Sequence, residues 1–198
     1  LCNNDSSFVM NNKVCWQQRP KATHLINAVV LLKVVGAIHS HYPGGLGSNI
    51  DELVVGCEKI MANNDGKVTF RKNIRTFFEL LEETWGISTI SNVKGAPQIK
   101  APFMRTLARV LADHEDFWRG EELFIPAGLR RKLKLFKIMD PVNQQLAGAH
   151  GATLALLYKV FVDHINLGKR TKHLTPRQRG EVIKSNGNKD EPSAGEAA

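Results

Sequence analysis

The chain has 198 residues, of which 42% are hydrophobic and 23% are charged, a balance that excludes a disordered protein and a miniature scaffold. Cys2, Cys15 and Cys57 form an odd set without a CxxC pair, which argues against a disulfide framework and a structural zinc site. The longest apolar run, residues 25–38, is shorter than the roughly 20 residues that cross a bilayer. We therefore expect a cytoplasmic protein without a membrane partner, and, because the chain begins at Leu1 rather than Met, part of a longer protein.

The net charge of +8 is distributed unevenly along the chain. Residues 1–123 hold 14 Lys and Arg against 13 Asp and Glu, whereas residues 124–198 hold 13 against 6. The basic excess therefore lies almost wholly in the C-terminal part, where we expect the binding surface for any polyanion.

The first 22 residues show no sustained period and predict an irregular lead-in. Thr23 is placed to cap a helix from about His24 to Ser40, because a threonine hydroxyl can accept from a first-turn N–H. Apolar residues cover nearly every face of this helix, which predicts that it lies at the centre of the fold.

Two further helices are predicted between residues 49 and 85. Asn49 and Glu52 have the spacing of a capping box, and the helix they open is expected to close at residues 63–66. Thr69 is expected to cap the next helix, whose apolar stripe is the clearest helical period of the chain. The stripe consists of Phe70, Ile74, Phe77, Phe78, Leu81 and Trp85. We expect this helix and the one over residues 25–38 to form the core.

Prolines mark the remaining helix starts. Pro102 opens a helix that is expected to run through Asp116, and Pro126 opens another, with the apolar side chains of Leu129, Leu133 and Phe136 inside. A helical pattern follows Pro141, with flexible points at the glycines of residues 148 and 151, and ends near Ile165.

The sequence therefore predicts a mainly α fold, a single-domain bundle of six or seven helices. The expected organisation is an irregular lead-in (residues 1–22), a helical domain (23–168), a basic extension (169–186) and a disordered tail (187–198). The tail combines Gly, Pro, Ser and Ala and cannot bury enough apolar surface to offset its chain entropy.

The densest acid-plus-histidine segment is residues 113–116, Asp-His-Glu-Asp. A metal ion could draw on His114 and one carboxylate, but adjacent residues of a helix point about 100° apart, which favours a solvated helix end. His39 and His41 flank Ser40 at a predicted helix end, where imidazolium would interact well with the helix dipole. The chain has no GxSxG or HExxH motif, and we assign no catalytic residue, metal ligand or cofactor.

Two basic runs without an acidic residue lie in the C-terminal part, and they suit a polyanion because neutralising phosphates releases counterions. The candidate phosphate-binding residues are Arg130, Arg131, Lys134 and Lys137 in the first run, and Lys169, Arg170, Lys172, Arg177 and Arg179 in the second. Lys132 also belongs to the first run. A solvated helix face followed by a basic tail would have the same pattern.

Three stretches resemble the region that follows the nuclease-like core in bacterial and phage DGQHR-type proteins, a group related to ParB-like proteins. They are residues 1–8 leading to Val14-Cys15-Trp16, residues 73–78 ending at Trp85-Gly86, and residues 149–154. The Asp-Gly-Gln-His-Arg motif that defines the group is absent, since Lys67 and Val68 follow Asp65-Gly66. The resemblance implies the helical C-terminal part of a longer DNA-associated protein, with an N-terminal domain elsewhere as a partner.

The leading hypothesis is a non-enzymatic helical module that contacts the phosphate backbone of DNA or another nucleic acid, in a phage, plasmid or defence setting. The alternative is a helical protein–protein interaction domain whose basic residues provide solubility. An enzyme with a site around residues 113–116 ranks third.

Overall fold

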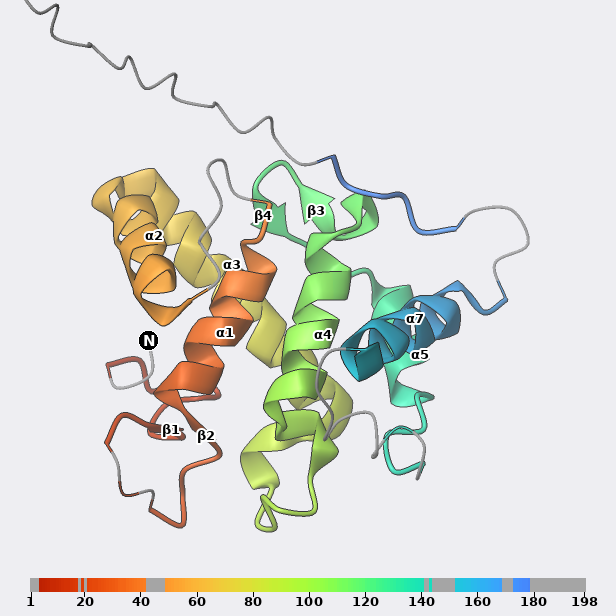
Figure 1. The fold of residues 1–198 in the computed structure, drawn as a ribbon, viewed down its shortest axis with the longest axis horizontal. Coiled ribbons are helices and arrows are strands. Elements are labelled where there is room, and N and C mark those ends of the chain that lie inside the picture. The colour runs from red at the N-terminus through yellow and green to blue at the C-terminus, as the bar shows by residue number, and fades with distance from the viewer. Residues whose placement is uncertain are drawn as a thin grey trace, which may run out of the picture.

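The computed structural model describes residues 4–17, 19, 21–41, 49–140, 143, 152–168 and 173–178 (Figure 1). The fold is mainly helical, as predicted. The described helices are α1 (Ala28–Ile38), α2 (Ile50–Ala62), α3 (Asn64–Trp85), α4 (Ala101–Ala112), α5 (Ala127–Lys134) and α7 (Ala152–Asn166). Short 3₁₀ turns lie at Ile87–Thr89, Pro97–Ile99 and Glu115–Phe117. The predicted disordered tail, residues 187–198, lies outside the described residues.

Two small sheets accompany the helices. β1 (Val14–Cys15) pairs in parallel with β2 (Ile26–Asn27), and β3 (Trp118–Arg119) pairs with β4 (Glu122–Leu123) in an antiparallel hairpin. Each strand has only two residues, too few for the alternating pattern by which a strand is found in a sequence.

Helix α1 begins at Ala28 rather than His24. The side chain of Asn27 accepts a hydrogen bond from the N–H of Val30 at 2.9 Å, so Asn27 is the N-cap and Thr23 lies outside the helix. Residues 26 and 27 pair with β1 instead, because the lead-in supplies a strand for them.

The capping box of α2 is confirmed, since the Glu52 N–H donates to Asn49 Oδ1 at 2.8 Å. The predicted start of α3 is wrong. Asn63 accepts from the N–H of Asp65 at 3.1 Å, so the segment expected to be a loop opens α3, which includes Thr69 in its second turn. Asn63 thus ends α2 and caps α3.

Helix α4 lies between α1 and α7, α2 lies on the far side of α1, and α3 runs behind α1 and α4 toward α5 (Figure 1). Its side chains at positions 103, 104, 107, 108, 110 and 112 have no exposed surface, so α4 is the central helix rather than α1. The ring of Phe103 contacts Trp85 of α3 and Phe161 of α7, with ring centroids 5.5 and 4.9 Å apart. The predicted stripe of α3 is buried as expected, apart from the partly exposed Trp85.

The lead-in packs on the same core. Phe8 is 2% exposed and meets the ring of Phe78 edge-on at 5.8 Å, and Met10 is 1% exposed. Arg75 of α3 forms an ion pair with Asp5. These contacts fasten the N-terminal segment to α3.

Residues 173–178, which we call the C-terminal strap, cross the turn that follows α4 (Figure 1). The Glu115 N–H donates to the carbonyl of Thr175 at 2.9 Å, and the Arg177 N–H donates to that of Asp113 at 2.7 Å. Leu174 is only 8% exposed. Within the described part of the chain, no helix has the length and apolar character needed to span a membrane.

Candidate functional site

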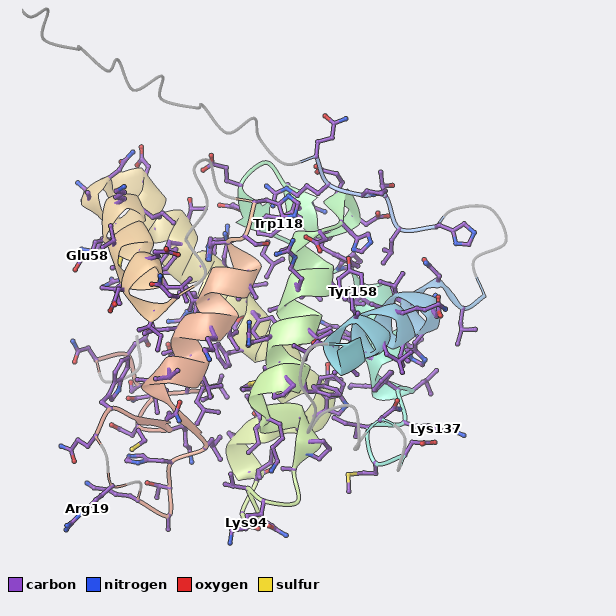
Figure 2. All side chains as sticks on the ribbon, in the orientation of Figure 1. Arg19, Glu58, Lys94, Trp118, Lys137 and Tyr158 are labelled. Carbon is purple, nitrogen blue, oxygen red and sulfur yellow. The ribbon has the colours of Figure 1, made fainter. Side chains whose placement is uncertain are left out.

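The first basic run follows α5 and the turn after it. Leu129 and Leu133 of α5 are buried against the core, whereas Arg130, Arg131 and Lys134 are exposed. Lys137, just beyond the helix, is also exposed, and Figure 2 shows it at the rim of the molecule. The predicted inner and outer faces of this helix are confirmed.

The members of the first run differ in whether their charge is already paired. Arg130 Nε lies 2.8 Å from Glu83 Oε2 on α3, in an ion pair at the surface. Arg131, Lys134 and Lys137 have no ion pair with any described residue. We call these three residues the α5 basic face.

Lys132 has a different role, because its side chain turns toward the end of α7. Its ammonium donates to the carbonyl of Leu167 at 2.6 Å and also to that of Ile165. The ring of His164 donates in turn from Nε2 to the carbonyl of Lys132 at 2.7 Å. Lys132 therefore caps the C-terminus of α7, where the helix dipole favours a cation.

The second basic run is described only at Arg177. Lys169, Arg170, Lys172 and Arg179 lie outside the described residues. Helix α7 ends at Asn166, and Leu167, whose carbonyl accepts from Lys132, precedes Lys169 by two residues in the sequence.

Arg177 lies apart from the α5 basic face. Its guanidinium carbon is 4.0 Å from the centre of the Trp118 ring, and Figure 2 shows Trp118 far from Lys137. The Arg177 side chain is 18% exposed, and its nearest carboxylate oxygen, of Glu115, is 3.8 Å from Nε. Burial lowers the pKa of Arg177, while Glu115 and Glu121 act in the opposite direction.

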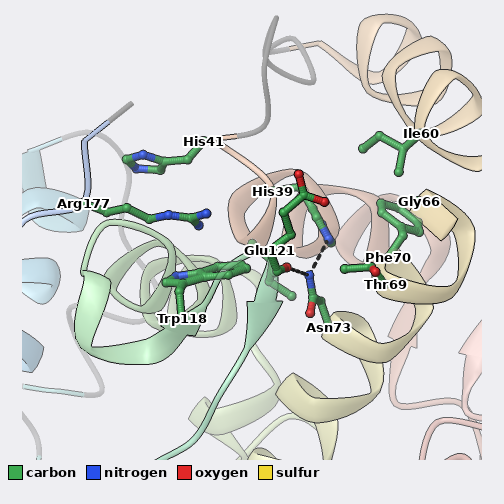
Figure 3. Close-up of a pocket in the computed structure, with 11 residues that line it drawn as sticks. His39, His41, Ile60, Gly66, Thr69, Phe70, Asn73, Trp118, Glu121 and Arg177 are labelled. Carbon is green, nitrogen blue, oxygen red and sulfur yellow. Dashed lines mark hydrogen bonds between the residues drawn. The ribbon is translucent and has the colours of Figure 1, made fainter. Parts of the chain in front are cut away.

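Arg177 forms one wall of a pocket that we call the Arg177 pocket (Figure 3). The end of α1 contributes His39 and His41, α3 contributes Thr69 and Phe70, and the β3–β4 hairpin contributes Trp118 and Glu121. The cavity is small and open on one side, with a volume of about 60 Å³. Its walls thus come from four separate parts of the sequence.

His39 is a neutral residue of this wall. It is 7% exposed, donates from Nδ1 to the carbonyl of Val35 at 3.1 Å and lies against the Phe70 ring, with centroids 4.5 Å apart. Burial lowers the pKa of His39 to about 4, helped by the positive charge of Arg177. The expected imidazolium at the end of α1 is therefore wrong for His39.

Asn73 fixes the hairpin beneath the pocket (Figure 3). Its Nδ2 donates to the carbonyl of Glu121 at 2.9 Å, and its Oδ1 accepts from the N–H of Leu123 at 2.8 Å. Asn73 is 1% exposed, so both ends of the buried amide are satisfied by the backbone of the hairpin.

Asp113 joins three elements beside the pocket. Its carboxylate lies 2.6 Å from His41 Nε2 and accepts from Arg109 Nε at 2.8 Å and from the Tyr158 hydroxyl at 3.2 Å. Burial acts to raise the pKa of Asp113, but the hydrogen bonds from Arg109 and His41 outweigh it and hold that pKa below its usual range. Burial and the Asp113 charge raise the pKa of Tyr158 to about 12.

The other members of the acidic segment point to different partners. His114 donates from Nδ1 to the carbonyl of Val110 at 2.7 Å, and Asp116 accepts from the N–H of Thr175 at 2.7 Å. The described residues contain no group of three or more His, Cys, Asp or Glu side chains that could hold a metal ion. The segment acts as the turn that the strap covers.

No protein-family model, curated protein or solved structure matches this chain. The resemblance to DGQHR-type and ParB-like proteins therefore stays a prediction.

Proposed function

We propose that this chain binds nucleic acid through the phosphate backbone, using the α5 basic face. The observation that carries the proposal is that Arg131, Lys134 and Lys137 are exposed and have no carboxylate partner among the described residues. Cations that no carboxylate neutralises can release counterions from phosphates without first breaking an ion pair.

The second support is the position of α7. The bond from Lys132 to the carbonyl of Leu167 holds the end of α7 against α5. Lys169, Arg170 and Lys172 follow within five residues of that carbonyl in the sequence. We propose that these cations also bind phosphates, as part of a longer phage, plasmid or defence-related protein.

A protein partner is the second candidate, and exposed apolar side chains favour it. Leu135 is 71% exposed, Met139 59% and Leu167 65%, and all three lie next to the basic residues. An acidic partner with apolar side chains would match such a mixture. The two candidates differ in salt dependence, because apolar burial is not screened by ions.

The test measures the affinity for labelled duplex and single-stranded DNA as a function of salt. For a phosphate-binding surface, the logarithm of the binding constant falls linearly with the logarithm of salt, and each lost phosphate contact reduces the slope by about one. The double variant R131E/K134E is expected to bind more weakly and to reduce the slope by about two.

The matched control is R71E/K94E, which makes the same charge change at two exposed residues outside α5. This variant should retain most of the affinity. Equal losses in both double variants would mean that only net charge matters. Absent or salt-independent binding by the unmodified chain would contradict the proposal and favour the protein partner.

A further inference from the structure

The guanidinium of Arg177 is only partly buried, with 18% of the side chain exposed. Its nearest carboxylate oxygen, of Glu115, is 3.8 Å from Nε, and the guanidinium makes no hydrogen bond to any residue in the described part of the chain. Its N–H groups are therefore accessible to an acceptor at the wall of the Arg177 pocket.

Stacking fixes the orientation of these N–H groups. The guanidinium lies over the Trp118 ring at 4.0 Å, and the Trp118 Nε1 donates to the carbonyl of Leu111 at 2.8 Å, which anchors the ring to α4. The backbone N–H of Arg177 is also held, by Asp113. A planar cation held in this way is preorganised for a planar anion such as a carboxylate.

The opposite side of the pocket is apolar. Phe70, Ile38 and Ile60 line it together with the neutral ring of His39, and Thr69 adds one hydroxyl (Figure 3). A ligand that fills the pocket thus meets a flat apolar wall beyond the arginine. Pockets of this composition bind the apolar body of a ligand and use few polar groups to orient it.

The carboxylates near Arg177 limit the charge of the ligand. Glu115 lies 3.8 Å from Arg177, and Glu121 lines the pocket. Because both negative charges would repel a dianion more strongly than a monoanion, a phosphate monoester is disfavoured.

We propose that the Arg177 pocket binds a small organic monocarboxylate with a flat apolar body. The carboxylate pairs with the Arg177 guanidinium in a bidentate manner, and the apolar body lies against Phe70 and its neighbours. This proposal is independent of the α5 basic face, since no residue is shared between the two sites.

Calorimetric titration of the full chain tests the ligand class. Benzoate and phenylacetate are the probes, benzyl alcohol is the neutral analogue, and inorganic phosphate and a deoxynucleoside monophosphate are the anionic alternatives. Saturable binding of a carboxylate probe is expected, with benzyl alcohol weaker by about tenfold or more because it lacks the charged hydrogen bonds. Tighter binding of phosphate or the nucleotide would overturn the assignment, as would no saturable carboxylate binding.

Variants test the pose. R177Q should lose most of the carboxylate affinity, R177K should recover only part of it because lysine lacks the planar fork, and T69L should block the pocket without touching the arginine. E121Q should strengthen binding by removing a like charge. R131E/K134E, which weakens the proposed DNA binding, should leave carboxylate binding unchanged.

Circular dichroism and thermal melting verify that each variant is folded. Should R177Q not fold, T69L and E121Q decide, because neither residue holds the strap. Carboxylate affinity that is unchanged in T69L and in a folded R177Q would place binding elsewhere and overturn the proposal.

Discussion

Lys132 of α5 donates a hydrogen bond to the main-chain carbonyl of Leu167, 35 residues further along the chain, at 2.6 Å. The same ammonium also reaches the carbonyl of Ile165. One lysine of a basic run thus closes the C-terminus of α7, while its neighbours Arg131 and Lys134 remain exposed. A run of like charges can therefore combine a structural cation with cations that are free for a ligand.

The change Lys132→Met tests this division. It keeps an unbranched side chain but removes the ammonium from the last carbonyls of α7, so we expect the free energy of unfolding to fall by about 1–3 kcal/mol. Urea unfolding measures it. The control Lys134→Met alters an exposed residue of the same helix and should change stability by about 0.5 kcal/mol or less. Equal effects of the two substitutions would contradict the capping role.

The C-terminus of α3 depends on Gly86, whose φ of 58° lies in the left-handed region. Gly86→Ala should reduce stability by about 1 kcal/mol, because a Cβ is strained in this conformation. Gly128→Ala in α5 is the matched control. A Cβ there meets no atom within 4 Å, and we expect stabilisation by about 0.5–1 kcal/mol from the better helix propensity of alanine. Thermal melting of both variants should give shifts of opposite sign.

The sequence correctly predicted the elements that depend on residues close together in the chain. The apolar stripe of α3 and the Asn49 capping box depend on residues three or four apart, and both are present. The boundary between α2 and α3 could not be decided in this way. An Asn-Asn-Asp-Gly segment can end one helix or begin another, and Asn63 does both.

The features that the sequence did not predict depend on contacts between residues that are far apart in the chain. Phe8 belongs to no helical repeat, so the sequence predicted an irregular lead-in. In the structure, Phe8 is buried against Phe78. The partner of His41 is Asp113, 72 residues away, and no spacing rule connects them. The Arg177 pocket was missed for the same reason, although one signal was available. Asn73 stands among the apolar stripe of α3, where a buried amide must have partners.

Asn73 gives a third prediction, since its amide satisfies two backbone groups of the β3–β4 hairpin. Asn73→Leu should lower the free energy of unfolding by about 2–4 kcal/mol, because the Leu123 N–H and the Glu121 carbonyl lose their partner. The hairpin amides should also exchange faster with solvent. The neighbouring Lys72 pairs with Glu122 at the surface, and Lys72→Ala should change stability by about 1 kcal/mol or less.

His39 gives the last prediction, a dependence of stability on pH. The pKa of His39 is about 4 in the folded chain, against an ordinary value of 6.5. Between these two values the unfolded chain binds a proton at His39 that the folded chain does not. The stability contributed by the neutral ring is therefore complete above pH 6.5 and is lost as the pH falls toward 4, by about 3 kcal/mol in total.

Urea unfolding at several pH values should show this loss, and His39→Leu isolates it because leucine keeps the site apolar and cannot bind a proton. The leucine variant should lose less stability over the same pH range.

Asp113 does not interfere, since its pKa is lowered below 3.8 and its contribution to stability disappears only in more acidic solution. The other histidines are present in both proteins, so the difference between the two pH profiles belongs to His39. Parallel profiles would mean that His39 is protonated without loss of stability, and the neutral wall of the Arg177 pocket would then have to be abandoned.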